Sequence, residues 1–456
     1  MKTHNASFLG VICALALAGP VYAQVPSGND TSDGNDNTGM GRGALGGPAP
    51  ANVGSENTAS GFDALNSNTT GINNTASGVD ALYSNTTGYS NTASGYYALE
   101  RNTSGDGNTA VGTGALAFNT TGHFNTAAGL DALSLNSSGI YNTASGVDAL
   151  YSNLTGYSNT AAGTSALYSN TSGDENTASG TNALFYNTIG NQNTATGFSA
   201  LADNTTGYSN TASGYGALDS NSTGIENVAY GASALYNNSG SNNTASGAYA
   251  LDFNTTGNYN IAMGYQAGLN LTTGSNNIEI GNEGAAGDNK VIKIGTEGTQ
   301  KKAFIAGIFS NTAVSGLTVV IGSNGELGAV SSSERFKTAI APMGSNTAKL
   351  KQLRPVTFHL KADPKGAPQY GLIAEEVAKV YPELVVRDQK GRICGVRYDE
   401  LAPMLLNEVQ KQAAEIRELK QQQKQFATQA ELNNLKQQLQ AALAALRSKD
   451  QLVAQR

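Results

Sequence analysis

A serine and a lysine stand five residues apart in the segment 331–337, which reads S-S-S-E-R-F-K. The two residues are Ser332 and Lys337. A serine is a poor nucleophile until a base removes its proton, and a lysine can be that base where burial or a neighbouring cation lowers its pKa. A serine-rich turn beside a lysine is also common solvated surface. The two residues alone therefore leave a catalytic dyad and a plain surface turn both open.

No other group of reactive side chains has a spacing that indicates chemistry. The sequence has no cluster of His, Cys and carboxylates at metal-ligand spacing, no glycine motif for phosphates or dinucleotides, and no calcium-binding nonapeptide. His359 is expected to be a half-buried strand residue, and His123 lies in a repeat turn. Cys394 is expected to be a small apolar strand residue, with a reactive thiol as the alternative. We therefore predict no cofactor and no metal.

The sequence around the serine-rich segment favours the catalytic interpretation. Residues 325 to about 420 contain, in this order, N-G-E-L-G, S-S-S-E-R-F-K, L-R-P-V-T-F, G-L-I-A-E-E-V, P-E-L-V and V-R-Y-D-E-L. In these motifs and their order, the segment resembles the self-cleaving intramolecular chaperone domain of phage endosialidase tail spikes. That domain belongs to a peptidase family that also occurs at the ends of bacterial and phage fibre proteins.

The resemblance implies a role for each residue of the motif. In that family the motif is Ser-Asp-x-Arg-x-Lys, and the chain is cut just before the serine. Carried over, Ser332 is the nucleophile and Lys337 is its base. The scissile bond joins Ser331 to Ser332, and Arg335 matches the arginine of the motif. Ser333 departs from the family, because it stands where Asp is common.

The resemblance also implies a mechanism of assembly. The C-terminal module brings three chains into register, the protein folds as a homotrimer, and cleavage then releases the module as residues 332–456. The remaining fibre, residues 24–331, is kinetically trapped because the piece that could guide reassembly is gone.

The elements that must position the motif lie on both sides of it. A β-connector is expected at 296–330, and a small α/β module at 331–401, which we expect to be the chaperone and protease. The tail at 402–456 predicts a coiled coil, although glutamines at core positions leave the number of helices open. Its heptad positions are Leu405, Val409, Gln412, Ile416, Leu419, Gln423 and Phe426, then, after a slip, Leu432, Leu435, Leu439, Ala442 and Leu446.

Most of the chain, residues 57–295, repeats the seventeen-residue pattern N-T-A-S-G-x-x-A-L-x-x-N-T-T-G-x-x. So strict a period indicates that each unit is one rung of a stack. The units have no helical periodicity, and their N-x-x-G segments are typical of turns between short extended segments. The fold class is therefore mainly β: a parallel β-roll or β-helix solenoid, with its hand left open.

The side chains that face the solenoid interior are harder to assign. Ile278 and Ile280 flank Glu279, and Ile292 and Ile294 flank a lysine, so alternation predicts that positions two and four point inward. The core would then be thin, with a leucine at position nine as its largest residue. We expect too little burial in one chain to offset the ordering entropy, so three copies round an axis would have to supply the rest.

Asparagines recur in every unit, many of them in Asn-x-Ser/Thr triplets. Because they occupy the turns, we expect ladders of hydrogen-bonded asparagines rather than glycosylation acceptors. Over about 225 residues the repeats also resemble the head repeats of trimeric autotransporter adhesins, which are trimeric left-handed parallel β-rolls. The chain departs from that family in ending in a polar helix, so we expect it to lack that family's membrane anchor.

The N-terminus and the charge distribution indicate where the protein works. Residues 1–23 have the plan of a secretory signal, followed by a flexible leader at 24–56, in which residues 37–45 resemble a decayed repeat. We expect an exported protein, extracellular or at the cell surface, with no transmembrane segment in its mature form. Between Asn57 and Asn289 the only basic residue is Arg101, which argues against a nucleic-acid partner.

The sequence therefore predicts an exported homotrimeric fibre or adhesin-like surface protein that is cut once by its own Ser/Lys dyad. One alternative is an uncleaved adhesin with the module as a permanent trimerisation clamp, and another is a phage-derived protein of the tail-fibre type. A polysaccharide-cleaving enzyme needs paired carboxylates in a groove. The acids of the repeats recur instead as scattered surface charges at position seven, as in Asp63, Asp80, Asp131 and Asp148. No ligand for the repeats can be assigned.

Overall fold

The computed structural model describes residues 33–46, 54–305, 318–322, 325–329, 331–388 and 390–453. The expected signal sequence, residues 1–23, lies outside the described residues, as does the leader as far as residue 32. The chain divides into two compact units, Met1–Phe304 and Ile305–Arg456, which are considered separately.

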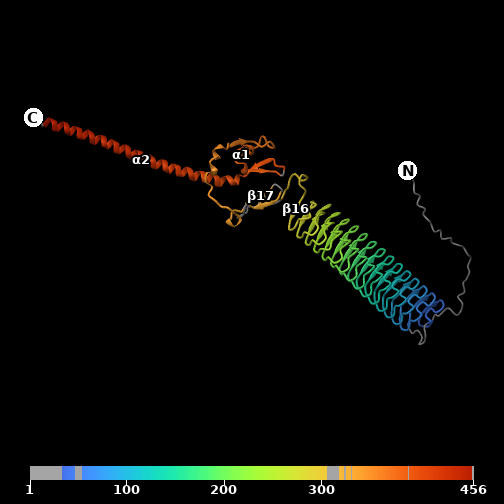
Figure 1. The fold of residues 1–456 in the computed structure, drawn as a ribbon. Helices are drawn as coiled ribbons and strands as arrows, with labels where there is room; N and C mark the ends of the chain where they lie inside the picture. Colours follow the sequence, from blue (N-terminus) through green and yellow to red (C-terminus); the bar gives the residue numbers. More distant parts are fainter. Residues whose placement is uncertain are drawn as a thin grey trace, which may run out of the picture. The chain divides into compact units, whose positions relative to one another are not determined.

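The first unit is a parallel β-solenoid built from seventeen-residue repeats, which confirms the predicted architecture (Figure 1). Its described residues form one sheet of sixteen strands in chain order. Each is three residues long: β1 Thr38–Met40, β2 Thr58–Ser60, β3 Thr75–Ser77, β4 Thr92–Ser94, β5 Thr109–Val111, β6 Thr126–Ala128, β7 Thr143–Ser145, β8 Thr160–Ala162, β9 Thr177–Ser179, β10 Thr194–Thr196, β11 Thr211–Ser213, β12 Val228–Tyr230, β13 Thr244–Ser246, β14 Ile261–Met263, β15 Ile278–Ile280 and β16 Ile292–Ile294.

Strand β1 lies inside the segment that the sequence predicted to be a flexible leader. It pairs in parallel with β2, so that Thr38 lies opposite Thr58. The decayed repeat still has the asparagine that joins one rung to the next, because the Asn37 side chain accepts a hydrogen bond from the backbone N–H of Asn57 (2.9 Å). This part of the leader is therefore the first rung of the solenoid.

The prediction that positions two and four face the interior is wrong. In β7, for example, Thr143 and Ser145 are exposed and Ala144 is fully buried. The interior of each typical rung holds this alanine together with the alanine and the leucine at positions eight and nine, here Ala149 and Leu150. These alanines and this leucine fill the core within one chain, and the expectation that three chains supply further burial stays a prediction.

Neighbouring rungs pack with their backbones in close contact, and tight backbone turns make this possible. The glycine at position five has a positive φ, +133° in Gly112, and a Cβ there would overlap the carbonyl oxygen of Gly129 in the next rung. The buried leucine also has a left-handed backbone, with φ of 53° in Leu133. This conformation is uncommon for a leucine. Here the Leu133 N–H donates to Ala149 O of the next rung (2.9 Å), and its carbonyl accepts from the Asn136 N–H (3.1 Å).

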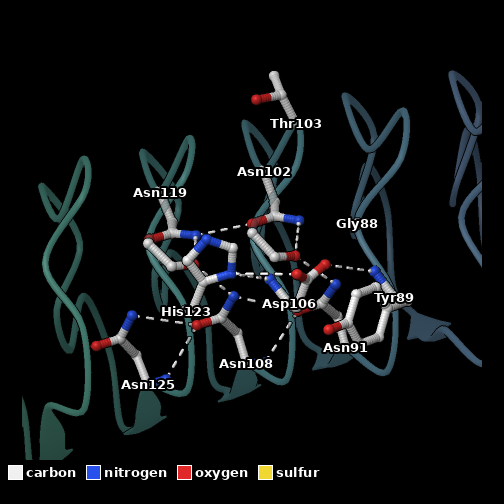
Figure 2. A network of polar contacts seen from close by, with 12 residues as sticks. Gly88, Tyr89, Asn91, Asn102, Thr103, Asp106, Asn108, Asn119, His123 and Asn125 are labelled. Atoms are coloured by element: carbon white, nitrogen blue, oxygen red, sulfur yellow. Dashed lines mark hydrogen bonds and ion pairs between the residues drawn. The ribbon is translucent and has the colours of Figure 1, made fainter.

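Two ladders of buried asparagines run along the stack (Figure 2). In the first ladder, Asn108 donates from its backbone N–H (2.9 Å) and from Nδ2 (3.1 Å) to Oδ1 of Asn91. In the second, Asn119 Nδ2 donates to Asn102 Oδ1 (2.7 Å) and to Gly122 O (3.0 Å). This confirms the expected ladders. Asparagines of the second ladder head many of the Asn-x-Ser/Thr triplets, and because these asparagines are buried the folded stack offers no room for a glycan on them.

The second unit consists of short elements and one long helix. Its antiparallel pairs are β17 Val319–Ile321 with β18 Leu327–Ala329, β19 Val356–Phe358 with β20 Gln369–Gly371, and β21 Val385–Arg387 with β22 Ile393–Val396. Its helices are the 3₁₀ turns η1 Glu334–Phe336, η2 Gly344–Thr347, η3 Leu350–Gln352 and η4 Pro382–Leu384, and the α-helices α1 Ala374–Val380 and α2 Tyr398–Val453.

The core of the second unit is small and lies at the start of α2. Val377 of α1 packs there with Tyr381, Leu384, Val385 and Met404. Beyond this core, the apolar heptad residues of α2 are exposed. Among the described residues, no helix combines the length and the apolar character that a membrane crossing requires.

Candidate functional site

The serine-rich motif forms a tight turn in the second unit. Ser333 is extended and precedes η1, whose single turn is closed by hydrogen bonds from Phe336 N to Ser333 O (3.0 Å) and from Lys337 N to Glu334 O (2.9 Å). This turn folds the chain back so that side chains five residues apart meet. Lys337 Nζ donates a hydrogen bond to Ser332 Oγ at 3.1 Å.

This contact has the direction of an ammonium group that donates to a hydroxyl. For Lys337 to act as a base, the amine must be neutral and must instead accept the Ser332 proton, and removal from water favours that neutral form. Both side chains are exposed in this single chain. The geometry thus places the two groups within proton-transfer distance, while the desolvation that base catalysis needs has to come from further burial.

The other residues of the predicted site lie close by but outside the Ser–Lys contact. Ser331 and Ser333 are exposed, so the bond before Ser332 is accessible. The Arg335 guanidinium lies over the ring of Phe336, 4.6 Å from its centroid. Such a cation–π contact fixes the direction of the arginine side chain on the surface of the turn.

Two polar contacts stabilise the fold of the segment that follows the motif: an ion pair between side chains, and a hydrogen bond from the backbone to a tyrosine hydroxyl. Arg354 donates from Nε (3.2 Å) and Nη2 (2.6 Å) to the two carboxylate oxygens of Glu376 in α1, and this hydrogen bonding lowers the pKa of that carboxyl. The Tyr398 hydroxyl accepts from Leu372 N (2.8 Å). Together these contacts attach the residue that follows Leu353 to α1, and the segment after β20 to the start of α2.

The sequence analysis missed a buried polar cluster at Thr347, which attaches η2 to the long helix. The Thr347 hydroxyl donates to Glu408 Oε2 (3.0 Å) and accepts from Asn407 Nδ2 (2.7 Å) and Lys411 Nζ (3.1 Å). Thr347 is fully buried. The available signal was the group of polar residues at 407, 408 and 411, which share one face of the predicted helix.

The side chains set aside in the sequence analysis show no sign of a second catalytic centre. His359 is exposed just after β19, with Nδ1 3.0 Å from Gly366 O, so the expectation of a half-buried strand residue is wrong. Cys394 lies in β22, as expected, and is exposed, with its thiol 3.4 Å from Val386 O. His123 accepts a hydrogen bond at Nδ1 from the Asp106 N–H of the preceding rung (3.0 Å; Figure 2).

The acids at position seven of the repeats are stacked rather than scattered. Burial raises the pKa of Asp131, and the neighbouring Asp148 one rung further on raises it again. Burial, followed by Asp63, does the same for Asp80. Within the described part of the chain, no group of three or more His, Cys, Asp and Glu residues could hold a metal ion.

Comparison with known families matches residues 332–386 to the peptidase S74 family, described as chaperone of endosialidase. The match begins at Ser332 and ends in β21, so it covers the Ser–Lys turn and most of the small core. It points to autocatalytic peptidase activity and to a chaperone domain of the tail-spike kind. Neither the curated proteins nor the solved structures provide a match to the chain.

Proposed function

We propose that this protein is an exported, trimeric fibre of the tail-spike kind, whose C-terminal unit directs assembly and then cuts the chain between Ser331 and Ser332. The observation that carries the proposal is the 3.1 Å contact between Lys337 Nζ and Ser332 Oγ, at the first residue of the chaperone-family match. The single parallel solenoid is the fibre that such a unit would serve.

The cut follows from the chemistry of the two side chains. Neutral Lys337 removes the Ser332 hydroxyl proton while Oγ attacks the carbonyl carbon of Ser331, the residue just before it. The C–N bond breaks, the Ser332 nitrogen takes a proton, and an ester links Ser331 to Ser332 Oγ. Water then hydrolyses the ester, which leaves a carboxylate on Ser331 and a free amine and hydroxyl on Ser332.

Assembly would supply the missing desolvation. Because Lys337 and Ser332 are exposed in one chain, a second chain packed over η1 would remove water from the pair and favour the neutral amine. Cleavage would then follow trimer formation rather than precede it. The released unit would begin at Ser332, and the fibre would be unable to use it again.

The test is denaturing electrophoresis of the expressed full chain beside Ser332→Ala and Lys337→Ala. We expect the wild-type chain to give two bands and both variants to stay intact. Ser333→Ala and Lys365→Ala change an adjacent serine and an exposed lysine outside the turn, and they should still be cut. An uncut wild type, or cutting that persists in both dyad variants, would remove the basis for this proposal.

A second function is favoured by the exposure of the Ser–Lys pair and by Ser333 at the usual Asp position. In this alternative the unit remains attached as a permanent trimerisation clamp on a surface adhesin. The Thr347 cluster, which attaches the long helix to the small core, suits a lasting clamp as well as a temporary chaperone. The same gel distinguishes the two functions, because a clamp leaves the wild-type chain whole.

A further inference from the structure

The outer face of the solenoid sheet is free of charge. It is formed by the residues at positions two and four of each rung, which are the first and third residues of every strand from β1 to β16. Over most of the stack these are threonine, serine and alanine. The strands have charged residues only at the middle position, in β15 and β16, and that position belongs to the inner side of the sheet in the other strands.

At the C-terminal end of the stack the outer face becomes strongly apolar. Its residues over the last three strands are Ile261, Met263, Ile278, Ile280, Ile292 and Ile294, which we call the isoleucine face. Met263 is 53% exposed, Ile292 66% and Ile294 74%, while the two isoleucines of β15 are half-buried. One face of three adjacent strands therefore presents large apolar side chains to water.

The polarity of these rungs is inverted compared with an ordinary solvated sheet. Glu279 of β15 lies inside the rung and is paired with Lys293 on the adjacent strand β16, while the isoleucines of both strands lie outside. A strand exposed to water on its outer face would have polar residues there and apolar ones within. The alternating isoleucines, which the sequence predicts to form an intrachain core, thus indicate burial against something outside the chain.

A second exposed apolar surface in the same chain indicates what covers the isoleucine face. Along α2 the heptad residues are exposed, among them Leu435 at 64% and Leu439 at 62%. Apolar residues at successive heptad positions are the surface through which helices of the same kind pack together. This points to copies of this chain as the partner. Cyclic symmetry then brings the same rung of each copy to the same level, so isoleucine meets isoleucine and no charge is buried.

We propose that the isoleucine face is the surface through which three copies of this chain pack together. This inference rests on the proposed function, because it assigns the solenoid's contact surface in the proposed trimer. The contact lies at the end of the solenoid that the chain leaves to enter the chaperone unit. Packing would start there and continue along the uncharged threonine and serine face toward the N-terminus.

Single cysteines test the contact directly. In a full chain with Cys13→Ser and Cys394→Ser, Ile261→Cys and Ile292→Cys are each treated with a short thiol–thiol cross-linker. The matched control is Thr273→Cys, at an exposed turn residue of the same repeat as Ile261. We expect covalent pairs of chains from both isoleucine positions and at least a tenfold lower yield from Thr273. Each full chain then has a single thiol, so a bridge reports a contact between copies at that position.

Charge placed on the face tests its contribution to assembly. The double variant Ile261→Lys and Ile292→Lys should lose trimer mass in light scattering, while Thr273→Lys should keep it. A trimer that survives the double lysine variant and bridges through Thr273 rather than the isoleucines would overturn the isoleucine face and leave the proposed trimer intact. A wild-type chain that is monomeric before and after cleavage would refute both, and the cleavage gel reports the Ser–Lys chemistry separately.

Discussion

Glu279 should make the end of the solenoid sensitive to pH near neutrality. Its side chain is fully buried in the penultimate described rung, and neither carboxylate oxygen has a hydrogen-bond partner among the described residues. Burial raises its pKa to about 7, opposed by the positive charge of Lys293 and reinforced by Asp288. Lys293 and Asp288 form an ion pair with each other. The perturbation we choose is Glu279→Gln, which keeps the shape and cannot ionise.

The sign of the effect follows from the direction of the shift. The folded chain holds the Glu279 proton more tightly than the unfolded chain, whose carboxyl has the ordinary pKa of 4.5. The stabilisation is therefore fully present below pH 4.5 and is lost as the pH rises through about 7. At 1.36 kcal/mol for each pKa unit, the loss amounts to about 3 kcal/mol for the terminal rungs.

Amide hydrogen exchange measures this loss where it occurs, because a long repeat array need not unfold in one step. The informative amides are those of Gly281 and Gly295, which donate to Met263 O (2.9 Å) and Ile280 O (2.8 Å). After correction for intrinsic exchange, we expect their protection in the wild type to fall roughly a hundredfold from pH 5 to pH 8.5. Glu279→Gln should show no such fall, and Glu283→Gln, at an exposed position, should behave as the wild type.

Two results would refute the reasoning. One is an equal fall in the wild type and in Glu279→Gln, because the pH dependence would then belong to another group. The other is protection in the wild type that rises with pH, because that would require a carboxylate stabilised as the anion rather than as the acid.

Three further substitutions test the packing of each unit by urea unfolding. Leu150→Ala truncates the largest buried side chain of a central rung and leaves a cavity, so it should lower the free energy of unfolding by about 2–5 kcal/mol. Tyr157→Ala, at a position that is 41% exposed, should lower it by less than about 1 kcal/mol. Asn153→Ala removes the hydrogen bonds to Asn136 Oδ1 (2.8 Å) and Gly156 O (3.0 Å). It should lower the free energy of unfolding by at least about 3 kcal/mol, because the two buried acceptors left behind have no water to take the place of the Asn153 amide. Thr347→Val should loosen the attachment of α2 by about 1–3 kcal/mol, while Thr347→Ser keeps the hydroxyl and should remain near the wild type.

The strict repeat made the solenoid predictable, since a seventeen-residue period with turn residues at fixed places leaves few alternatives to a stack of rungs. The asparagine ladders followed from the same reasoning, because an amide repeated once per rung meets its own copy. The left-handed leucine at position nine could not be foreseen. Its backbone conformation is unfavourable for the residue alone and is held by bonds to the next rung, as in Leu133.

The direction of the strand side chains was wrong for an identifiable reason. Thr, Ala and Ser are too similar in size and polarity to reveal a buried face. Large strand residues occur in succession only in the last rungs of the described sheet, and those, such as Ile292, lie on the outer face. The predicted alternation of side chains along each strand was correct. The choice between the two faces was wrong because it relied on the isoleucines of the last rungs, which lie on the outer face.

The candidate site was partly predictable. The five-residue spacing places Lys337 against Ser332 because a single 3₁₀ turn lies between them. The exposure of both side chains could not be deduced from the motif, since burial depends on which surfaces cover the turn. Thr347 was missed because its partners Asn407 and Glu408 lie about sixty residues away. The polar face of the helix indicates a partner but does not say which residue it is.

The central claim is that this chain cuts itself before Ser332. Its most direct test is the mass and N-terminal sequence of the smaller fragment from purified wild-type chain, beside the Ser332→Ala chain. The account predicts one fragment that begins at Ser332 and ends with the chain, formed without added protease and absent from the variant. A wild-type chain that stays intact after assembly, or a fragment that begins at another residue, would contradict it.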